Sequence, residues 1–286
     1  KATIQGPKHK RVPDDVAENP VIVGHEFCGD IIKVGKNCDK KYNVGNKFAI
    51  QPAISDPANV HAAPGYSFKY IGGAATYVII PSVVMERNCL MDYSGESYYM
   101  GSLAEPVSCI VGGFNVNYHS DPGSYVHKMG IVEGGKMALL AGVGPMGLGA
   151  IDYAIHCERR PSLLVVTDID DARLKRAEQI YTVEEAAKNG VELIYVNTSG
   201  IEDVSGKLRE LTGGTGFDDV YVYAPVKALL QQASDILGYD GCLNFFAGPT
   251  DPAFSAEFNF YNVHYMNTHV AANSGGNNND LLEAID

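Results

Sequence analysis

The hydrophobic pattern changes character near the middle of the chain. Between residues 21 and 115, short stretches rich in β-branched residues are separated by glycines and prolines, a pattern typical of irregular β structure. The expected strands cover residues 21–23, 29–34, 47–52 and 75–81. Residues 52–73 are rich in Pro, Ala, Gly and Tyr and are expected to form a long loop, and the pattern turns helical around residues 105–117.

From about residue 136 the pattern predicts strands that alternate with helices. The expected strands are residues 136–141, 163–168, 192–197, 219–224, 242–247 and 268–272, with helix-length segments such as 146–157, 171–179 and 227–237. Strands that are apolar on both faces belong in a parallel sheet covered by helices. The pattern therefore predicts an α/β fold, with a smaller, mainly β domain over residues 1–115 and a Rossmann-type, doubly wound nucleotide-binding domain over residues 116–286.

Length and charge narrow the class of protein. The chain has 286 residues, 45% of them hydrophobic, which is enough for two domains with real cores. A net charge of −12 argues against nucleic acid or an anionic membrane as a partner. The six cysteines form no C-x-x-C pair, which suits reduced thiols better than a disulfide framework. No apolar run is long enough to span a membrane, so we expect a soluble, cytoplasmic protein.

Both ends of the chain look truncated. The sequence starts without an initiator methionine, and its first residues do not resemble a signal peptide. It stops at residues 281–286, inside an apparent helix. We therefore expect the chain to be the ordered or expressed part of a longer polypeptide.

A glycine-rich turn follows the predicted strand at residues 136–141 and opens a helix-like segment. In this context Gly142 allows a tight turn, Gly144 lets the backbone approach a pyrophosphate, and Gly147 allows close packing of helix on sheet. The free N–H groups at the start of the helix would face the phosphate charge. The pattern predicts a dinucleotide site; the alternative is a structural glycine turn.

Asp168 ends the next predicted strand, 26 positions after Gly142. A carboxylate there can bind both ribose hydroxyls of a dinucleotide and would repel a 2′-phosphate, which favours NAD over NADP. Arg173 complicates this interpretation because it could contact the adenosine end or a 2′-phosphate. The alternative is that Asp168 is an ordinary surface aspartate.

Three residues are candidates for a metal site in the first domain. His25 and Glu26 follow Gly24 at the end of a predicted strand, and Glu105 precedes a predicted helix. Imidazole and carboxylate are both zinc ligands. Alone, however, a His-Glu pair is more often a surface pair or a satisfied core histidine, and Glu105 would be a first-turn carboxylate that favours the helix dipole.

Taken together, these residues resemble the zinc-dependent medium-chain dehydrogenases, in particular the branch of sorbitol and threonine dehydrogenases. The motifs that carry the resemblance are Gly24-His25-Glu26 with Phe27-Cys28-Gly29, Val34-Gly35, Val44-Gly45-Asn46, Glu105-Pro106, the G-x-G-P-x-G of residues 142–147, and Asp168 with Arg173. The resemblance runs over essentially the whole chain.

The resemblance implies a GroES-like first domain with one catalytic zinc, held by a cysteine, His25 and Glu105, with Glu26 as a direct or alternate ligand. The family's cysteine precedes the Gly-His-Glu motif and would lie before residue 1. Cys28 is on the wrong side of the motif and is better interpreted as a small buried apolar residue. No cysteine lies between Cys38 and Cys89, so no structural zinc is expected.

The same resemblance implies further contacts in the nucleotide-binding domain. The residues expected to contact the cofactor are Gly142, Gly144, Pro145, Met146, Gly147, Asp168, Arg173, Ala247 and Ser274. Relatives are dimers or tetramers, so a homo-oligomer is expected by analogy alone.

Narrower motifs resemble the bacterial L-sorbose 1-phosphate reductases, which interconvert L-sorbose 1-phosphate and D-glucitol 6-phosphate. These motifs are Gly65-Tyr66-Ser67, Ile71-Gly72-Gly73, residues 102–106 and residues 244–249. Zinc would then polarise the carbonyl of a ketose while hydride moves from the nicotinamide. Manganese or iron could also occupy such a site.

A phosphorylated substrate calls for cationic donors. The dense basic cluster of this acidic chain comprises Lys8, His9, Lys10 and Arg11, and one hypothesis is that one or more of its members bind the phosphate. The alternative is a solvated surface loop. Tyr66, Tyr70 and His61 are candidates for contacts with sugar hydroxyls, against plain loop packing.

Two other functions remain open at this point. A metal-free quinone or enal reductase would need neither Glu105 nor the Gly-His-Glu motif. A non-catalytic NAD-binding regulator or scaffold of the same fold would not need the cysteine ligand.

Overall fold

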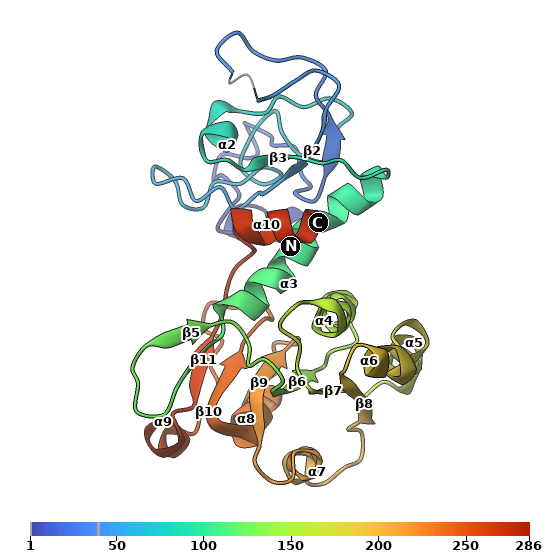
Figure 1. The fold of residues 1–286 in the computed structure, drawn as a ribbon. Helices are drawn as coiled ribbons and strands as arrows, with labels where there is room; N and C mark the ends of the chain where they lie inside the picture. The colour runs from blue at the N-terminus through green and yellow to red at the C-terminus, as the bar shows by residue number, and fades with distance from the viewer. Residues whose placement is uncertain (1, 39–40) are drawn as a thin grey trace. The chain divides into compact units, whose positions relative to one another are not determined.

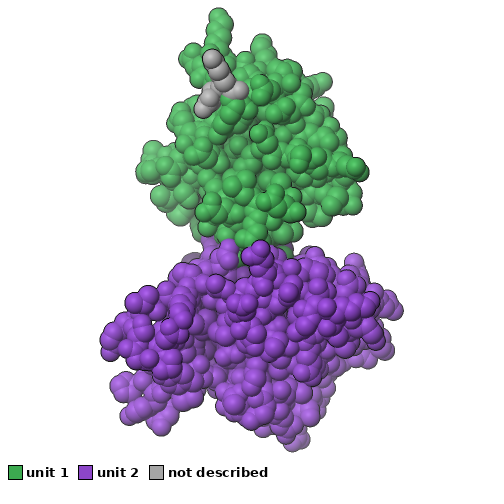
Figure 2. Space-filling view, viewed as in Figure 1, with its two compact units in different colours: residues 1–111, 275–286 green, residues 112–274 purple. Residues whose placement is uncertain are grey.

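The structure, a computed structural model, describes residues 2–38 and 41–286. The chain divides into two compact units (Figure 2). Unit 1 comprises residues 1–111 and 275–286, and unit 2 comprises residues 112–274. In the part of the chain that the structure describes, no helix is long and apolar enough to span a membrane.

Unit 2 contains a six-stranded parallel sheet with helices on both faces (Figure 1). The strand order is β11-β10-β9-β6-β7-β8. The strands are β6 (Lys136–Leu140), β7 (Leu163–Asp168), β8 (Glu192–Asn197), β9 (Phe217–Val222), β10 (Leu237–Asn244) and β11 (His269–Ala271). The central strand β6 pairs with both β7 and β9, and the strand order reverses at this position. The predicted Rossmann-type sheet is confirmed.

The helices of unit 2 connect these strands. They are α4 (Pro145–His156), α5 (Asp171–Ile180), α6 (Val183–Lys188), α7 (Val204–Leu211), α8 (Lys227–Ile236) and α9 (Phe260–Met266). Side chains on both faces of the sheet are buried, for example Ala138 and Val165 on one face and Leu139 and Val166 on the other. This burial explains why these strands read as continuous apolar runs instead of alternating ones.

One strand begins earlier than its hydrophobic pattern indicates. The sequence predicts a strand over residues 242–247, whereas β10 spans Leu237–Asn244. Its pairing with β9 shifts register between Leu237 and Cys242, and Asp240 adopts a positive φ of 55°. This irregularity brings polar and glycine residues into the strand, and they hide its first half from the apolar pattern.

A short antiparallel hairpin in unit 2 was not predicted. It consists of β4 (Tyr118–Ser120) and β5 (His127–Met129). The imidazole of His119 attaches it to the sheet: Nε2 lies 3.1 Å from Oδ1 of Asp219, and Nδ1 lies 3.0 Å from the carbonyl oxygen of Asp240. Asn117 donates a further hydrogen bond of 2.6 Å to the buried Asp219.

Unit 1 is built on a three-stranded antiparallel sheet of β1 (Cys28–Asp30), β2 (Lys47–Ile50) and β3 (Leu90–Asp92). Its helices are α1 (Ala2–Gln5), the 3-10 helix η1 (Gly6–Lys8), α2 (Ser82–Glu86), α10 (Asn278–Ile285) and most of α3 (Tyr98–Val116). The long loop predicted for residues 52–73 is present, since no helix or strand lies between β2 and α2.

Two strands predicted for unit 1 are wrong. Residues 21–23 and 75–81 are irregular, and the chain near Gly24 forms two backbone hydrogen bonds with residues 73 and 74 instead of a ladder. Ala74 donates to the carbonyl of Val23 over 3.0 Å, and Gly73 donates to that of Gly24 over 2.7 Å. Gly24 has a φ of 96°, which interrupts an extended chain.

Residues 275–286 pack in unit 1, although the sequence analysis assigned them to the nucleotide-binding domain. The side chain of Leu281 is fully buried in a cluster with Ala49, Met91 and Ala104. Gln51, itself fully buried, donates a hydrogen bond of 3.0 Å to the carbonyl of Asn277. The last helix therefore contributes to the core beneath the small sheet.

Candidate active site

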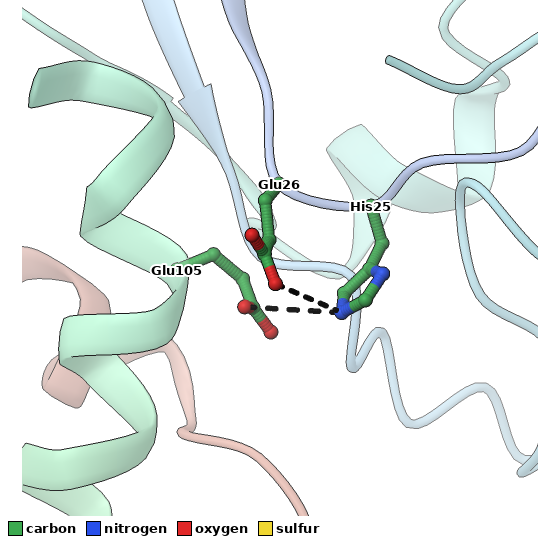
Figure 3. Close-up of side chains that lie close together, drawn as sticks. All are labelled: His25, Glu26 and Glu105. Carbon is green, nitrogen blue, oxygen red and sulfur yellow. Dashed lines mark ion pairs between the residues drawn. The ribbon is translucent and has the colours of Figure 1, made fainter. Parts of the chain in front are cut away.

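Three side chains of unit 1 converge on one point. His25, Glu26 and Glu105 each offer a ligand atom, and these atoms all lie within 4.8 Å of one another. Nε2 of His25 is 3.7 Å from Oε1 of Glu26 and 4.0 Å from Oε2 of Glu105. Figure 3 shows two of the side chains arriving from a loop and the third from helix α3. The predicted trio thus comes together in space.

Glycines hold the loop that carries His25. A Cβ at Gly65 would overlap the carbonyl of Gly24, and a Cβ at Gly24 would come within 3.2 Å of the backbone nitrogen of Gly73. Both Gly24 and Gly65 also have positive φ values, which favour glycine. Three stretches of backbone therefore pack at distances that side chains would prevent, and this packing fixes where the imidazole begins.

Glu105 lies inside helix α3, not at its start. The helix begins at Tyr98, seven residues earlier, so the expectation of a first-turn carboxylate is wrong. Pro106 hid this from the sequence because proline usually marks the beginning of a helix. The side chain of Glu105 is 9% exposed. Its position one turn before Cys109 places the thiol 3.7 Å from Oε1 of Glu105.

Cys109 is a neighbour of the site that the sequence analysis missed. Its thiol donates to the carboxylate of Glu105 in the same helix. Burial, followed by the charge of Glu105, raises the pKa of Cys109 to about 12, so the thiol keeps its proton. The signal that could have revealed this contact is the i, i+4 spacing from Glu105.

The electrostatics of the trio suit a bound cation. Burial, followed by the charge of Glu26, raises the pKa of Glu105 to about 7. Burial lowers the pKa of His25, and this effect outweighs the opposing charge of Glu26. Two carboxylates beside a neutral imidazole form a set of donors that can bind a divalent metal.

These residues fit a zinc ion. One imidazole nitrogen and two carboxylate oxygens are ligands that zinc accepts, and three protein ligands leave a position open for substrate. The side chain of Glu26 is 51% exposed, so it can move toward or away from a metal. Cys28, in β1, is not part of this cluster; it is half-buried beside Tyr93 and Gly101.

The basic segment before this loop separates into two pairs of side chains. Lys8 and Lys10 are exposed, whereas His9 and Arg11 are partly buried against Tyr66. The Tyr66 hydroxyl oxygen is 3.3 Å from Nε2 of His25. Among the predicted substrate contacts, the structure therefore places Tyr66 next to His25, with Arg11 against the Tyr66 ring, and leaves both lysines in solvent.

The two other candidates for sugar contacts, His61 and Tyr70, form hydrogen bonds through their backbone carbonyls. The carbonyl of His61 accepts a hydrogen bond of 3.5 Å from the guanidinium of Arg11, and the carbonyl of Tyr70 accepts one of 2.9 Å from Ile79. The side chain of Tyr70 is exposed.

In unit 2, the glycine-rich turn joins β6 to α4. A Cβ at Gly147 would overlap the carbonyl of Gly142, so close packing of the helix requires glycine at this position. A Cβ at Gly144, in contrast, would meet nothing within 4 Å. Gly144 is also the N-cap of α4 and provides no side-chain cap. Free N–H groups and open space at a helix start suit a phosphate.

The remaining cofactor candidates follow other strands of the same sheet. Asp168 ends β7, Ala247 follows β10 and Ser274 follows β11. The carboxyl ends of parallel strands lie along one edge, where open α/β sheets bind their ligands. Oδ1 of Asp168 accepts hydrogen bonds from the backbone nitrogens of residues 169 and 170, at 2.8 and 3.0 Å. Arg173 extends from α5, with its Nε 3.8 Å from Asp170.

A doubly wound sheet with a dinucleotide-type turn, together with a His-Glu-Glu cluster in a separate β unit, is typical of metal-dependent nicotinamide oxidoreductases. The sequence matches two family profiles. They are described as "Zinc-binding dehydrogenase", over residues 145–286, and "Alcohol dehydrogenase GroES-like domain", over residues 3–92. The chain belongs to the family of zinc-dependent medium-chain dehydrogenases and is a dehydrogenase of the alcohol and polyol type.

Three curated relatives are about half identical to this chain. An uncharacterized protein of Escherichia coli, YggP, is 52% identical over 285 residues. A mannitol-1-phosphate 5-dehydrogenase of Aliivibrio fischeri is 51% identical over 286 residues, and an L-sorbose 1-phosphate reductase of Klebsiella pneumoniae is 49% identical over 281. Each alignment includes 98–100% of this chain and 67% of the relative, so the chain spans about two thirds of their length.

Solved structures share the fold. The 2R,3R-butanediol dehydrogenase of Bacillus subtilis superposes with a TM-score of 0.68 at 21% identity, over 93% of this chain and 68% of that one. A zinc-binding dehydrogenase of Sinorhizobium meliloti, bound to NADP, gives a TM-score of 0.71 at 18% identity, over 93% and 72%. The GroES-like first domain and the doubly wound fold of the second domain are thereby confirmed.

Proposed function

We propose that this protein is an NAD-dependent, zinc-dependent reductase of a ketose phosphate, and that it interconverts L-sorbose 1-phosphate and D-glucitol 6-phosphate. The observation that carries the proposal is the convergence of His25, Glu26 and Glu105 within 4.8 Å, in a chain with a complete glycine-rich turn. The two named relatives act, by their names, on a sugar phosphate or a hexitol phosphate.

His25 and Glu105 would hold one zinc, with Glu26 as a direct or alternate ligand, and no structural zinc is proposed. Bound there, zinc supplies Lewis-acid polarisation of the ketose carbonyl. The neutral imidazole offers its lone pair, and the proton on Glu105 leaves as the metal binds. Helix α3 keeps the carboxylate of Glu105 away from bulk water, which strengthens its interaction with charge.

We propose that the glycine-rich turn, including Pro145 and Met146, binds the pyrophosphate, and that Ala247 and Ser274 contact the cofactor from neighbouring loops. The preference for NAD is inferred from Asp168 and Arg173. Oδ1 of Asp168 is occupied by backbone N–H groups, which leaves Oδ2 for a ribose hydroxyl. Arg173 lies near the carboxylate of Asp170, and this pairing competes with binding of a 2′-phosphate.

A second candidate is the oxidation of mannitol 1-phosphate, favoured by the relative that bears this name. Both candidates can be compared by following absorbance of NADH and NADPH with L-sorbose 1-phosphate, free L-sorbose and mannitol 1-phosphate. The proposal predicts the highest kcat/KM for L-sorbose 1-phosphate with NADH. Faster turnover of mannitol 1-phosphate with NAD would favour the second candidate, and equal turnover of free and phosphorylated sorbose would contradict the first.

A further inference from the structure

An arginine lies beside the candidate metal site and forms no ion pair with a carboxylate among the described residues. The Cζ atom of Arg11 is 5.9 Å from the centroid of the Tyr66 ring. The hydroxyl oxygen of the same tyrosine is 3.3 Å from Nε2 of His25. One aromatic ring thus separates a guanidinium from a predicted metal ligand.

The backbone of Arg11 is held in place independently of its side chain. The hydroxyl of Ser67 donates a hydrogen bond of 2.7 Å to the carbonyl of Arg11 and accepts one of 3.0 Å from the backbone nitrogen of Ala63. His9 stacks on Tyr66 with an interplanar angle of 9°, and its Nδ1 accepts a hydrogen bond from the backbone nitrogen of Arg11. This segment therefore has a defined position beside the loop of residues 61–67.

Most of the hydrogen-bonding capacity of the guanidinium is unused. A guanidinium carries five N–H donors, and among the described residues Arg11 uses one of them, in a 3.5 Å bond to the carbonyl of His61. None of the ion pairs between described residues includes Arg11. The guanidinium of Arg209, in contrast, donates to three backbone carbonyls.

The charge of Arg11 is not needed to balance the metal site. Glu26 and Glu105, once ionised, neutralise a divalent metal, and His25 is neutral. A further cation at this place raises the positive potential and has a favourable role when an anion binds next to it. The planar guanidinium fork matches the geometry of a phosphate group.

We propose that Arg11 binds the phosphate of the substrate and determines the preference for phosphorylated sugars, with Tyr66 holding the guanidinium beside the metal site. This inference rests on the proposed function and deepens it. Lys8 and Lys10 point into solvent and contribute only diffuse attraction.

The test compares Arg11→Gln with Lys33→Gln in the zinc-loaded protein. Lys33 is an exposed lysine of the same unit, so its substitution removes the same charge elsewhere. We expect Arg11→Gln to lower kcat/KM for L-sorbose 1-phosphate by about 100-fold, mainly through KM, and that for free L-sorbose by less than about threefold. Arg11→Lys should lower kcat/KM for the phosphorylated sugar by about tenfold, because lysine keeps the positive charge but lacks the planar guanidinium fork.

Equal losses on both sugars in Arg11→Gln would overturn the inference, as would an equal loss in Lys33→Gln. A larger effect from the combined substitution Lys8→Gln and Lys10→Gln would overturn it as well. If Arg11→Gln does not fold, Arg11→Lys still tests the inference. If Arg11→Lys prefers the phosphorylated sugar as strongly as the unmodified protein does, the guanidinium does not have the proposed role.

A second measurement does not depend on turnover. Inorganic phosphate at 50 mM, a concentration of about the order needed for a weak anion site, should raise the melting temperature of the metal-free protein above that in sodium chloride of equal ionic strength. The rise should disappear in Arg11→Gln and remain in Lys33→Gln. If no sugar phosphate is turned over while this Arg11-dependent rise persists, the proposed function fails and the anion site stands. Absence of the rise in the unmodified protein overturns the site.

Discussion

A buried carboxyl group is costly unless a proton or a cation accompanies it, and Glu105 is in this position. Its side chain is 9% exposed and shares the cluster with Glu26, and its pKa is raised to about 7 mainly by burial. The neighbouring thiol of Cys109 can donate a hydrogen bond but supplies no positive charge. A metal bound between these groups would offset the free-energy cost of burying the Glu105 carboxylate, so substitution of Glu105 should change metal binding.

Replacing Glu105 with Gln should lower zinc affinity by about 100-fold, because the amide keeps the shape and loses the charge of a ligand. Affinity is measured by competition with a chromogenic chelator, with Glu96→Gln as the control. Glu96 is an exposed carboxylate of the same unit. Equal zinc affinities in the two variants would mean that Glu105 is not a ligand.

Asp168 permits a residue-scale test of cofactor choice. Asp168→Ala removes the carboxylate that would repel a 2′-phosphate, so the ratio of NADH to NADPH affinity should fall by about tenfold. Binding is followed by the fluorescence of the reduced nicotinamide, with the exposed Glu202→Gln as the control. An unchanged ratio would contradict the proposed preference for NAD.

Among single residues, the sequence predicted His25, Glu26 and Glu105 as one site only through the family resemblance. Glu105 lies about 80 positions after the other two, so no local pattern indicates that they meet. The contact with Cys109 was readable from helical spacing, whereas the packing of Arg11 against Tyr66 depends on the loop fold, which follows from close backbone approaches at Gly24 and Gly65. Spacing arguments do not reach such long-range loop contacts.

The turn between β6 and α4 contains one glycine that the packing requires and another next to open space. Gly147 touches the backbone of Gly142, whereas the space above Gly144 is open. The two positions should therefore respond differently to the same substitution.

Gly147→Ala should destabilise the fold by about 2 kcal/mol, since the helix must move away from the turn. Gly144→Ala should leave the melting temperature nearly unchanged and weaken NADH binding, because its methyl group enters the phosphate space. Thermal melts and NADH titrations of both variants check this prediction. The reverse pattern would show that the turn does not bind the pyrophosphate.

The β4–β5 hairpin depends on the protonation of His119. Burial alone would lower the pKa of His119, but the hydrogen bond and charge of Asp219, together with the carbonyl and charge of Asp240, raise it overall. Both ring nitrogens face acceptors, and His269 lies 5.9 Å away, ring to ring. The charged form is therefore favoured in the folded state.

A pKa raised by folding gives stability that is present below the unfolded value of about 6.5 and is lost as the pH rises through the folded value. The free energy of unfolding of the unmodified protein, relative to that of His119→Gln, should be larger at pH 6 than at pH 9. Urea melts at both pH values measure the difference. His264→Gln, at an exposed histidine, should show no such trend.

Elements were predicted well where burial is two-sided and poorly where it is not. All six strands predicted for the parallel sheet are present, although β10 begins five residues before its predicted start. In unit 1, residues 21–23 and 75–81 have β-branched residues but form no ladder, since propensity without a paired partner does not make a strand. The hairpin was missed because its strands are short and polar.

For the whole molecule, the chain leaves unit 1 within helix α3 and returns to it at Gly275. No local pattern could reveal this return, because α10 reads like the final helix of a nucleotide-binding domain. Its membership depends on contacts with residues about 200 positions earlier, including Gln51 and Cys89.

Leu281→Ala should therefore destabilise unit 1 by about 3 kcal/mol, since the side chain is fully buried there. Leu282, 49% exposed in the same helix, provides the control Leu282→Ala. Hydrogen exchange should rise in the peptides of residues 2–111 and not in those of β6 to β9. An increase confined to unit 2 would contradict the assignment of α10.

The most direct test of the account is the metal dependence of sugar-phosphate reduction. NADH oxidation with L-sorbose 1-phosphate is measured before chelation, after chelation and after zinc is restored, in the unmodified protein and in Glu105→Gln. Turnover should disappear with the metal, return with zinc and stay low in the variant. Turnover that survives chelation, or that is unchanged in Glu105→Gln, would contradict the claim that this cluster holds a catalytic zinc.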